Sequence, residues 1–183
     1  MGRIACAVLL AVLVPLSLAV AQPAKAPPAA ARAQVAVVTM ENGGLITLEF
    51  WPDVAPNHVK NFIDLAGKGF YDRQRVHRVE PKFVVQFGDP LSKTAPMNDP
   101  NMGSGGSDKK IKAEFNKKPF DRGVLGMART NDPDSASSQV YLMLGDSHFL
   151  NGQYTAFGKV TKGMDVVDTI KVGDRIKSIK IQH

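Results

Sequence analysis

The sequence predicts a mainly β fold, in which short strands form a closed antiparallel barrel accompanied by two helices. Two observations lead to this expectation. Many short segments alternate apolar and polar residues between glycines and prolines, and only two segments have the periodicity of an amphipathic helix. A closed barrel leaves no sheet edge unpaired, so it suits such a series of strands. With 183 residues, 44% of them hydrophobic, the chain suffices for one domain and a tail.

The first predicted element is a β-hairpin over residues 35–50. Its turn is Asn42-Gly43-Gly44, because Asn-Gly readily adopts the positive φ angles of a tight hairpin turn. In the second arm, Ile46, Leu48 and Phe50 alternate with polar residues, which indicates a strand with one buried face.

A helix is expected to begin at Pro56, because the fixed φ and missing N–H of proline are tolerated in the first turn. Its apolar residues form one stripe at positions i, i+3, i+4 and i+7: Val59, Phe62, Ile63 and Ala66. Gly67 or Gly69 is expected to end the helix. Such a stripe predicts that the helix packs on the sheet or covers one end of the barrel.

The remaining elements are predicted from the same two periodicities. Further strands are expected over 76–87, 123–128, 139–144, 154–160 and 176–182, the first of these as one or two strands. A second, short helix is expected over 165–171, where three apolar residues have helical spacing.

Residues 1–21 have the layout of a secretory signal peptide. Arg3 supplies the positive start, an apolar run covers 4–20, and Ala19-Val20-Ala21 is a small-residue cleavage pattern. We therefore expect cleavage after Ala21 and export, to a bacterial periplasm or as a secreted protein. The alternative is an uncleaved membrane anchor, against which the marginal length of the apolar run and Pro15 both argue.

Residues 22–33 consist mostly of alanine and proline and show no apolar periodicity. This composition predicts a disordered linker in front of one domain over 34–183. The only cysteine, Cys6, lies inside the predicted signal peptide. The mature chain is therefore expected to have no cysteine and no disulfide bond, a composition compatible with an oxidising compartment. Because cleavage removes the apolar run, no stable membrane insertion is expected either.

Charge and motifs argue against several classes of function. The formal net charge is +6, but lysine and arginine are scattered without interleaved aromatic residues, so no nucleic-acid partner is expected. The glycine-rich stretch 103–106 lacks the Gly-Lys-Ser/Thr ending of a P-loop, and no serine lies in a Gly-x-Ser-x-Gly pattern. No metal site is expected, because His58, His148 and His183 lack the spacing of metal ligands.

The segment 76–90 is the richest in side chains that could bind a ligand. Side chains two residues apart on a strand share a face, so the bend at Pro81 decides whether Arg78 and Phe83 point the same way. A cation, an aromatic ring and an amide on one concave face would make a small binding site. The alternative is a surface strand whose arginine forms an ordinary ion pair, and spacing alone leaves both open.

This segment resembles the cyclophilins, in which His-Arg and a proline precede Phe-x-x-Gln-Gly-Gly-Asp. The matching residues are His77, Arg78, Pro81, Phe83, Gln86, Gly88 and Asp89, while Phe87 replaces the first glycine of the family pattern. Further blocks resemble the family in the same order, over 103–106, 123–129, 138–142, 149–152 and 154–158. The resemblance covers roughly residues 35–183.

The resemblance implies a cyclophilin-like domain, a closed eight-stranded antiparallel barrel with a helix near each end, and peptidyl-prolyl cis/trans isomerase (rotamase) activity. The catalytic residues would be Arg78, Phe83 and Gln86. The substrate-binding residues would be Val84, Ala128, Arg129, Gln139, Tyr141, Phe149, Leu150 and Tyr154. The partners would be proline-containing peptides and unfolded chains, with no cofactor, and the protein would be a monomer that assists the folding of exported proteins.

The resemblance also implies roles for individual residues. Arg78 would donate a hydrogen bond to the proline nitrogen of the twisted amide, Gln86 would orient Arg78, and the main chain at Arg129 would hold the peptide. His77 is expected to be a structural hydrogen-bonding residue. Tyr141 stands where the family has phenylalanine, and its hydroxyl needs a partner or a water.

Two functions of other classes stay open beside the enzyme. One is a binding module or holdase that uses the same groove without catalysis. The presence of Arg78, Phe83 and Gln86 argues against it. The other is an interaction protein recruited through its charged loops, for which the sequence offers no specific partner surface.

Overall fold

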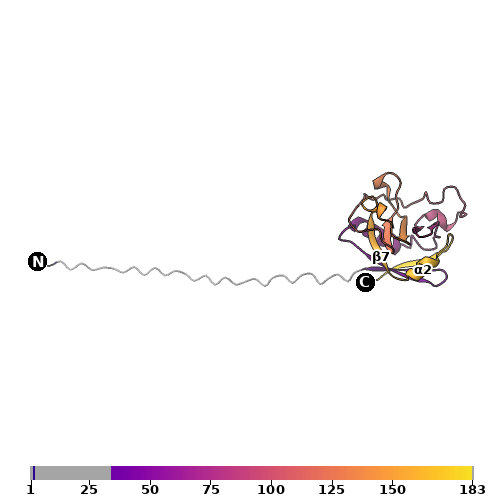
Figure 1. Ribbon diagram of the computed structural model, residues 1–183, viewed down its shortest axis with the longest axis horizontal. Coiled ribbons are helices and arrows are strands. Elements are labelled where there is room, and N and C mark those ends of the chain that lie inside the picture. Colours follow the sequence, from indigo (N-terminus) through magenta and orange to yellow (C-terminus); the bar gives the residue numbers. More distant parts are fainter. Residues whose placement is uncertain (1, 3–33, 183) are drawn as a thin grey trace. The chain divides into compact units, whose positions relative to one another are not determined.

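Eight antiparallel strands form one curled sheet (Figure 1). The computed structural model describes Gly2 and residues 34–182, so the predicted signal peptide (1–21, apart from Gly2) and linker (22–33) lie outside the described residues. The strands are β1 (Val35–Met40), β2 (Leu45–Phe50), β3 (Arg78–Glu80), β4 (Val84–Phe87), β5 (Val124–Met127), β6 (Val140–Met143), β7 (Ala156–Lys162) and β8 (Ile176–Gln182). Their order across the sheet is β3-β4-β6-β5-β7-β2-β1-β8. The predicted mainly β, antiparallel fold is confirmed.

The two ends of this sheet are β3 and β8, so the expected closed barrel is not confirmed and the sheet is a curled half-barrel. The reason is local. β3 has only three residues, and the segment before it, not the strand itself, runs beside the start of β8. Hydrogen bonds of 2.8 Å join Val76 N–H to the carbonyl of Asp174, and Ile176 N–H to the carbonyl of Gln74.

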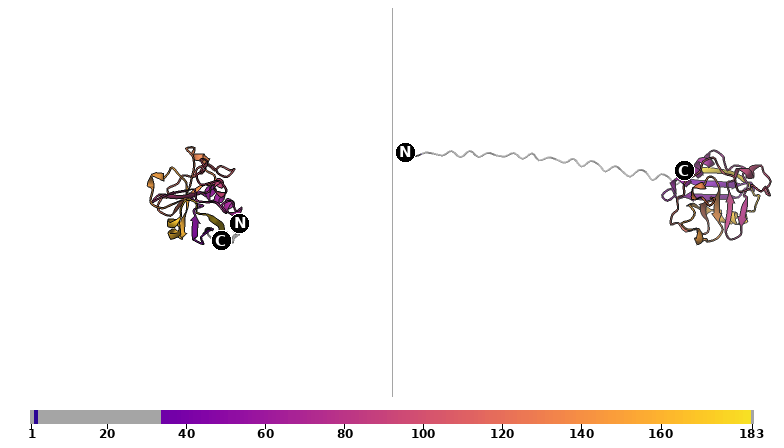
Figure 2. Two further views of the ribbon diagram at one scale, coloured as in Figure 1. Left: turned by 90° about the vertical axis from the view of Figure 1, so that its right-hand side faces the viewer. Right: turned by 90° about the horizontal axis from the view of Figure 1, so that it is seen from above.

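Two α-helices and three short 3-10 helices accompany the sheet. They are α1 (Pro56–Gly67), α2 (Met164–Thr169), η1 (Pro90–Lys93), η2 (Pro133–Ser135) and η3 (His148–Leu150). Figure 2 shows the domain from two further sides. The predicted start of α1 at Pro56 is confirmed, and Val59, Phe62 and Ala66 of its apolar stripe are buried. The second helix starts slightly earlier than predicted, after Gly163, which adopts the left-handed φ of 86°.

Buried apolar side chains form two clusters, because strands β4 and β6 bury both of their faces. The larger cluster lies between α1 and the sheet, where Tyr71 packs on Phe62 with ring centroids 5.0 Å apart. The smaller cluster consists of Val84, Phe120, Val124, Tyr141, Met143, Leu150 and Ala156. Residues along β6 alternate between the two, so this smaller cluster lies on the other face of the sheet.

Phe87, which departs from the family pattern, belongs to the larger cluster. It is 3% exposed and meets the edge of the Tyr71 ring at a centroid distance of 6.0 Å. Its neighbour Gln86 points to the opposite face, as alternation along a strand requires. The replacement of a glycine here therefore adds core packing and leaves the other face of β4 untouched.

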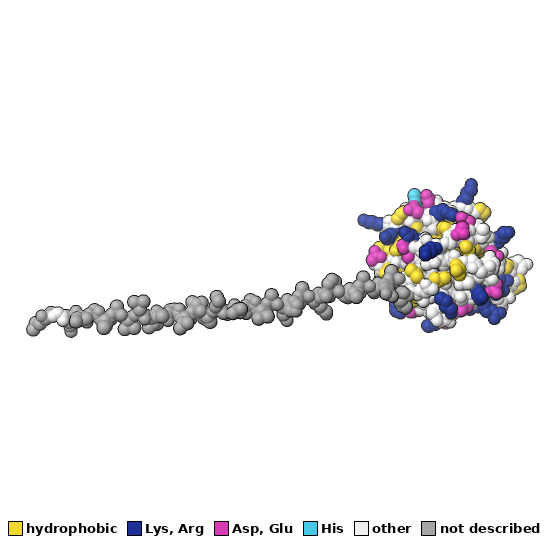
Figure 3. Space-filling view, turned by 90° about the horizontal axis from the view of Figure 1, so that it is seen from below, with side chains coloured by type: hydrophobic (Ala, Val, Ile, Leu, Met, Phe, Trp, Pro, Cys, Tyr) yellow, Lys and Arg dark blue, Asp and Glu magenta, His cyan; other side chains and the backbone are white. Residues whose placement is uncertain are grey.

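Charged side chains of both signs are dispersed over one face of the domain (Figure 3). On the face shown in Figure 3, lysine and arginine are interspersed with aspartate and glutamate. Within the described part of the chain, no helix has the length and apolar character to cross a membrane.

Glu114, in the long connection between β4 and β5, caps the start of α1. Its carboxylate accepts the N–H groups of Asn57 at 3.0 Å and His58 at 2.9 Å, and lies 2.6 Å from Nδ1 of His58. Burial lowers the pKa of His58 below its usual value, an effect that the hydrogen bond and charge of Glu114 only partly offset. Burial alone would raise the pKa of Glu114, but hydrogen bonds from His58 and Asn57 hold that pKa below its usual range. The fold therefore favours a neutral His58 beside an ionised Glu114.

We expect His58→Gln to reduce the loss of stability on acidification. Because the pKa of His58 is lower in the folded than in the unfolded chain, its contribution is complete above about pH 6.5 and is lost as the pH falls toward the folded pKa. Each pH unit inside that window costs about 1.4 kcal/mol. Glutamine keeps a donor for Glu114 but does not titrate.

Urea unfolding at about pH 7.5 and about pH 5.5 checks this prediction. Burial also lowers the pKa of His77, but His77 is present in both proteins, so its contribution cancels in the comparison. The free energy of unfolding should fall less between the two pH values for His58→Gln than for the wild type. Equal losses would show that His58 does not carry the pH dependence.

Candidate active site

Two neighbouring hollows lie on one face of the domain. The first, which we call the aromatic hollow, has a volume of about 330 Å³. It is lined by Arg78, Phe83, Val84, Gln86, Ala128, Arg129, Tyr141, Phe149, Leu150 and Tyr154. The second, the polar hollow, has a volume of about 470 Å³ and is lined mainly by residues 103–108, 128–132 and 135–139. Gln86, Ala128 and Arg129 line both hollows and form the ridge between them.

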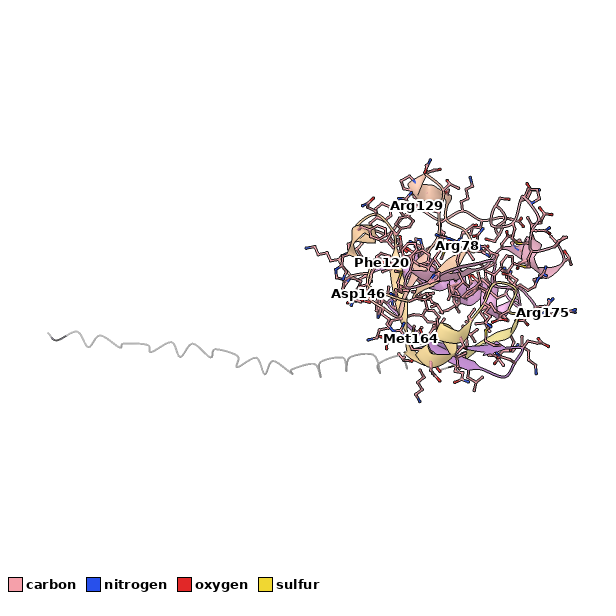
Figure 4. The ribbon with its side chains drawn as sticks, turned by 45° about the vertical axis from the view of Figure 1, so that its right-hand side comes forward. Arg78, Phe120, Arg129, Asp146, Met164 and Arg175 are labelled. Carbon is pink, nitrogen blue, oxygen red and sulfur yellow. The ribbon has the colours of Figure 1, made fainter. Side chains whose placement is uncertain are left out.

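The structure brings all the sequence-predicted site residues together. Ten of the eleven line the aromatic hollow, although they come from strands and loops far apart in the chain. The eleventh, Gln139, lines the polar hollow and is hydrogen-bonded to Gln86. Figure 4 shows Arg78 and Arg129 on the same side of the domain, away from Met164 and Arg175.

Strand pairing places Arg78 beside Gln86. The two residues are partners in the β3–β4 register, and Arg78 Nη1 donates to Gln86 Oε1 at 3.2 Å. The bend after Pro81 includes Lys82 at a positive φ of 61°, and the guanidinium of Arg78 lies over the Phe83 ring, 5.7 Å from its centroid. The question that spacing left open is thus answered, because Arg78 and Phe83 face the same hollow.

Arg78 also has an acidic neighbour, as the ion-pair alternative expected. Its Nε lies 3.4 Å from Glu80 Oε1, and the two side chains are 43% and 51% exposed. An ion pair this exposed contributes about 0–1 kcal/mol. Glu80 therefore does not by itself explain why the guanidinium lies at the edge of an apolar hollow.

A chain of amide hydrogen bonds orients Gln86. Gln139 Nε2 donates to the carbonyls of Gly103 and Gly105, both at 2.7 Å, so its Oε1 faces Gln86 and accepts from Gln86 Nε2 at 2.9 Å. The Oε1 of Gln86 is then left to accept from Arg78. The fully buried carboxylate of Asp89 holds the same loop by accepting the N–H of Gly103 at 2.6 Å. Through Gln139, the loop over 103–106 thus orients Gln86 so that its Oε1 faces Arg78.

The wall and floor of the aromatic hollow are apolar. Phe149, 66% exposed at the rim, stacks on Phe83 with ring centroids 5.8 Å apart. Leu150 and Tyr141 belong to the smaller buried cluster, which supports the floor from behind. A hollow of this kind suits a compact apolar ring such as that of proline.

The hydroxyl of Tyr141 is buried without a hydrogen-bond partner among the described residues. The phenol lies against Gly126, where even an added Cβ would come within 2.6 Å of its oxygen. Burial raises the pKa of Tyr141, the neighbouring Tyr154 raises it further, and the charge of Arg129 lowers it slightly in opposition. The partner that the sequence led us to expect for this hydroxyl is therefore not a side chain of the described region.

The hydrogen-bonding role expected for His77 stays a prediction. Both ring nitrogens are buried, and among the described residues they have no hydrogen bond of normal geometry, although the side chain of Gln139 lies near the ring. The ring lies against the glycine-rich loop, where a Cβ on Gly103 would be 3.5 Å from it. Burial lowers the pKa of His77, and the charge of Asp89 and the side chain of Gln139 only partly offset this, so the neutral ring is favoured. Neighbouring positions in the sequence could not show this, because the enclosing loop comes from later in the chain.

Sequence spacing also could not show that His148 lies near two aspartates. Ligand atoms of Asp121, Asp146 and His148 all lie within 4.8 Å of one another, and His148 Nε2 is 2.7 Å from Asp121 Oδ1. The His148 and Asp121 side chains are more than half exposed, and Asp146 accepts the N–H of Arg122. Exposed groups of this kind are common without a metal, and the expectation of no metal site stays a prediction.

Sequence reasoning missed three contributors to the site. Phe120 supports the floor, Glu80 pairs with Arg78, and the side chain of Arg129 packs on Tyr154. Phe120 and the Arg129 side chain act through contacts formed only when distant loops meet, so no local signal could have found them. Glu80 lies two residues from Arg78 on the same strand, so period-two spacing could have indicated its contact with Arg78.

Comparisons with known proteins agree with this arrangement. Residues 35–183 match the family described as "Cyclophilin type peptidyl-prolyl cis-trans isomerase/CLD". The chain is 41% identical over 150 residues to a Brucella abortus protein named "Probable peptidyl-prolyl cis-trans isomerase", covering 80% of this chain and 76% of the relative. It is 36% identical over 145 residues to peptidyl-prolyl cis-trans isomerase B of Bacillus subtilis, covering 78% and 94%.

A solved structure of a Cryptosporidium parvum cyclophilin-type peptidyl-prolyl cis-trans isomerase superposes on this fold with a TM-score of 0.71. The two are 25% identical, and the match covers 82% of this chain and 98% of the other. Fold, family match and relatives lead to the same conclusion. The chain belongs to the cyclophilin-type peptidyl-prolyl cis-trans isomerase family and is an enzyme of that type.

Proposed function

We propose that Arg78 catalyses rotation about X-Pro bonds by donating a hydrogen bond to the proline nitrogen of the twisted amide. Rotation breaks amide resonance, so the uncatalysed barrier is about 18–20 kcal/mol. In the twisted state the nitrogen regains its lone pair and becomes a good acceptor. The contact is therefore stronger in the transition state than in either planar form, which is the condition for catalysis.

The observation that carries this proposal is the position of the Arg78 guanidinium. It lies at the edge of the aromatic hollow, over Phe83, and is bonded to Gln86 at 3.2 Å. A donor held in place before the reaction costs no reorganisation when the amide twists. The guanidinium is always charged and has several N–H donors, so it can keep its bond to Gln86 while another N–H reaches the substrate.

The aromatic hollow would hold the proline ring. Phe83, Val84, Tyr141 and Leu150 would wall it, and Phe149 and Tyr154 would form its rim. Ala128 and Gln139 would line the neighbouring subsite, and the main chain at Arg129 would hold the peptide. With one side of the X-Pro bond seated and the other free, rotation needs no covalent intermediate and no cofactor.

A pair of peptides tests the binding part of the proposal. The two differ only in having Ala-Pro or Ala-Ala at one position, and both are titrated into the protein while side-chain NMR signals are followed. We expect the proline peptide to perturb Phe83, Tyr141 and Leu150 and to show accelerated cis/trans exchange. Equal perturbation by the alanine peptide would favour a holdase that uses the groove without recognising proline.

The proposal extends to where the enzyme works. The layout of residues 1–21 supports export, and the lack of cysteine after Cys6 is compatible with an oxidising compartment. The proposal is that the enzyme is bacterial and acts as a monomer on chains folding in the periplasm or outside the cell. Assisting the folding of exported proteins is the corresponding cellular role.

N-terminal sequencing of protein purified from its own cells tests the export proposal. We expect the mature chain to begin at Gln22, in a periplasmic or culture-supernatant fraction. A chain that begins at Met1 and is found with the cytosol would overturn export and leave the catalytic proposal unaffected.

A further inference from the structure

The side chain of Arg129 is engaged entirely with the protein around it. Its Nε and Nη2 donate to the carbonyl of Gln153 at 3.1 and 2.9 Å. Its Nη1 donates to the carbonyl of Thr130 at 2.8 Å and more weakly to that of Asn131 at 3.4 Å. All three guanidinium nitrogens thus bond to backbone oxygens of two loops, one directly after Arg129 and one that follows η3.

The same guanidinium also lies over two aromatic rings. Its central carbon is 4.4 Å from the centroid of Tyr154 and 5.9 Å from that of Phe115. A cation over an aromatic face is attracted to it, and more strongly where water is excluded. Phe115 is 42% exposed and belongs to the connection that leads to β5, so a third loop meets at Arg129.

We call residues 149–154 the rim. Within the described residues, the rim and the loop over 129–135 are joined by the hydrogen bonds of the Arg129 side chain. The rim is also held by bonds within itself, such as Tyr154 N–H to the carbonyl of Leu150 at 3.1 Å, and by Phe120, whose N–H donates to Asn151 Oδ1 at 2.9 Å. That rim carries Phe149, Leu150 and Tyr154, which line the aromatic hollow. Arg129 is therefore what ties this wall of the hollow to the ridge, while the bond from Phe120 ties it to the connection before β5.

Arg129 is also part of the ridge between the aromatic and polar hollows. A peptide that seats its proline in the first hollow and its preceding residues toward the second must cross this ridge. With its donors occupied by carbonyls, the guanidinium is not placed to capture an acidic group of a substrate. Its effect on substrate must pass through the loops that it holds.

We propose that Arg129 is a positioning residue. Its guanidinium clamps the rim over 149–154 to the ridge and so sets the width of the aromatic hollow. This inference rests on the proposed function, which places proline in that hollow. A planar guanidinium presents donors in several directions at once, whereas an ammonium on a flexible stem cannot bond Gln153 and Thr130 while also lying flat on Tyr154. Charge alone is therefore not sufficient for the role.

Three variants of the full chain test the clamp: Arg129→Gln, Arg129→Lys and, as a matched control, Arg122→Gln. Arg122 is an exposed arginine that bonds the carbonyl of Leu144 and pairs with Asp168, outside both hollows. We expect Arg129→Gln and Arg129→Lys to lower kcat/KM on a proline peptide about 10-fold, mainly by raising KM, since misplacing a binding wall weakens productive seating. Arg122→Gln should leave both constants unchanged.

Amide hydrogen exchange gives a readout that does not depend on activity. The N–H groups of Gln153 and Tyr154 should exchange about 10-fold faster in both Arg129 variants, because local opening becomes easier, while β5 to β7 stay protected. Wild-type kinetics in Arg129→Lys would overturn the proposal by showing that charge suffices. Unchanged exchange over 149–154, or a uniform rise across the sheet, would overturn it as well. If the wild type failed to accelerate the peptide, the proposed function would fail, but the exchange result would still decide whether the clamp exists.

Discussion

Replacing Arg78 by alanine is expected to lower kcat/KM for a proline peptide by about 10²–10³-fold, the loss typical of one preorganised donor to a developing charge or lone pair. The variant should fold normally, because the Arg78 side chain is 43% exposed and its loss opens no core cavity. A protease-coupled or NMR isomerisation assay gives the rate, and circular dichroism checks the fold. Full activity in a folded Arg78→Ala protein would refute the proposed mechanism.

Two further variants separate the donor from the ion pair. Arg78→Lys keeps the charge but cannot donate to Gln86 and substrate in the same fixed geometry, so it should recover only a small part of the loss. Glu80→Ala removes the exposed acidic partner and should change kcat/KM by less than about 3-fold. An equal loss in Glu80→Ala would mean that the ion pair, and not the position at the hollow, makes Arg78 important.

Replacing Gly88 by alanine is expected to cause a large loss of stability, about 3 kcal/mol or more. Gly88 has a φ of +109°, which residues with a side chain rarely adopt. A Cβ there would also lie 2.3 Å from the carbonyl oxygen of Ser138 and 2.7 Å from the Cα of Gln139, which are backbone atoms that cannot rotate away. Because Gly88 follows β4, the strain would also reach Gln86.

Gly43 and Gly67 are matched controls for this prediction. Gly43 has a positive φ of 89° with open space around it, so Gly43→Ala isolates the conformational cost of about 1 kcal/mol. Gly67 has neither strain nor a neighbour within 4 Å, so Gly67→Ala should be neutral or slightly stabilising. Urea unfolding of the three variants measures the differences. Equal effects of Gly88→Ala and Gly43→Ala would show that the contact with Ser138 relaxes at little cost.

The elements could be predicted largely from residue periodicity, because most of them bury one face. The strand over 176–182 and the start of the helix at Pro56 agree with the structure, while several other strands differ at one or both ends. Closure of the sheet could not be foreseen correctly, since it depends on which segment lies beside β8 and not on any local pattern. The three 3-10 helices were missed because three or four residues carry no detectable period.

The site residues were predictable through the resemblance to a family and not through spacing. Alternation along 76–87 could not decide whether Arg78 and Phe83 share a face, because the answer depends on the turn at Lys82. The cap of α1 by Glu114 and the proposed clamp by Arg129 could not be predicted either, because each joins segments far apart in the sequence. Glu114 contacts a helix that begins more than fifty residues earlier, and Arg129 contacts a loop more than twenty residues later.

The central claim is that Arg78 stabilises the twisted amide and not the bound planar substrate. NMR of one proline peptide can give the dissociation constant and the cis/trans exchange rate on the enzyme separately, for the wild type and for Arg78→Ala. The account predicts that the dissociation constant changes by less than about 3-fold while the exchange rate falls by at least about 100-fold. A weakening of binding that accounts for the whole loss of activity would contradict it, because Arg78 would then act on the ground state alone.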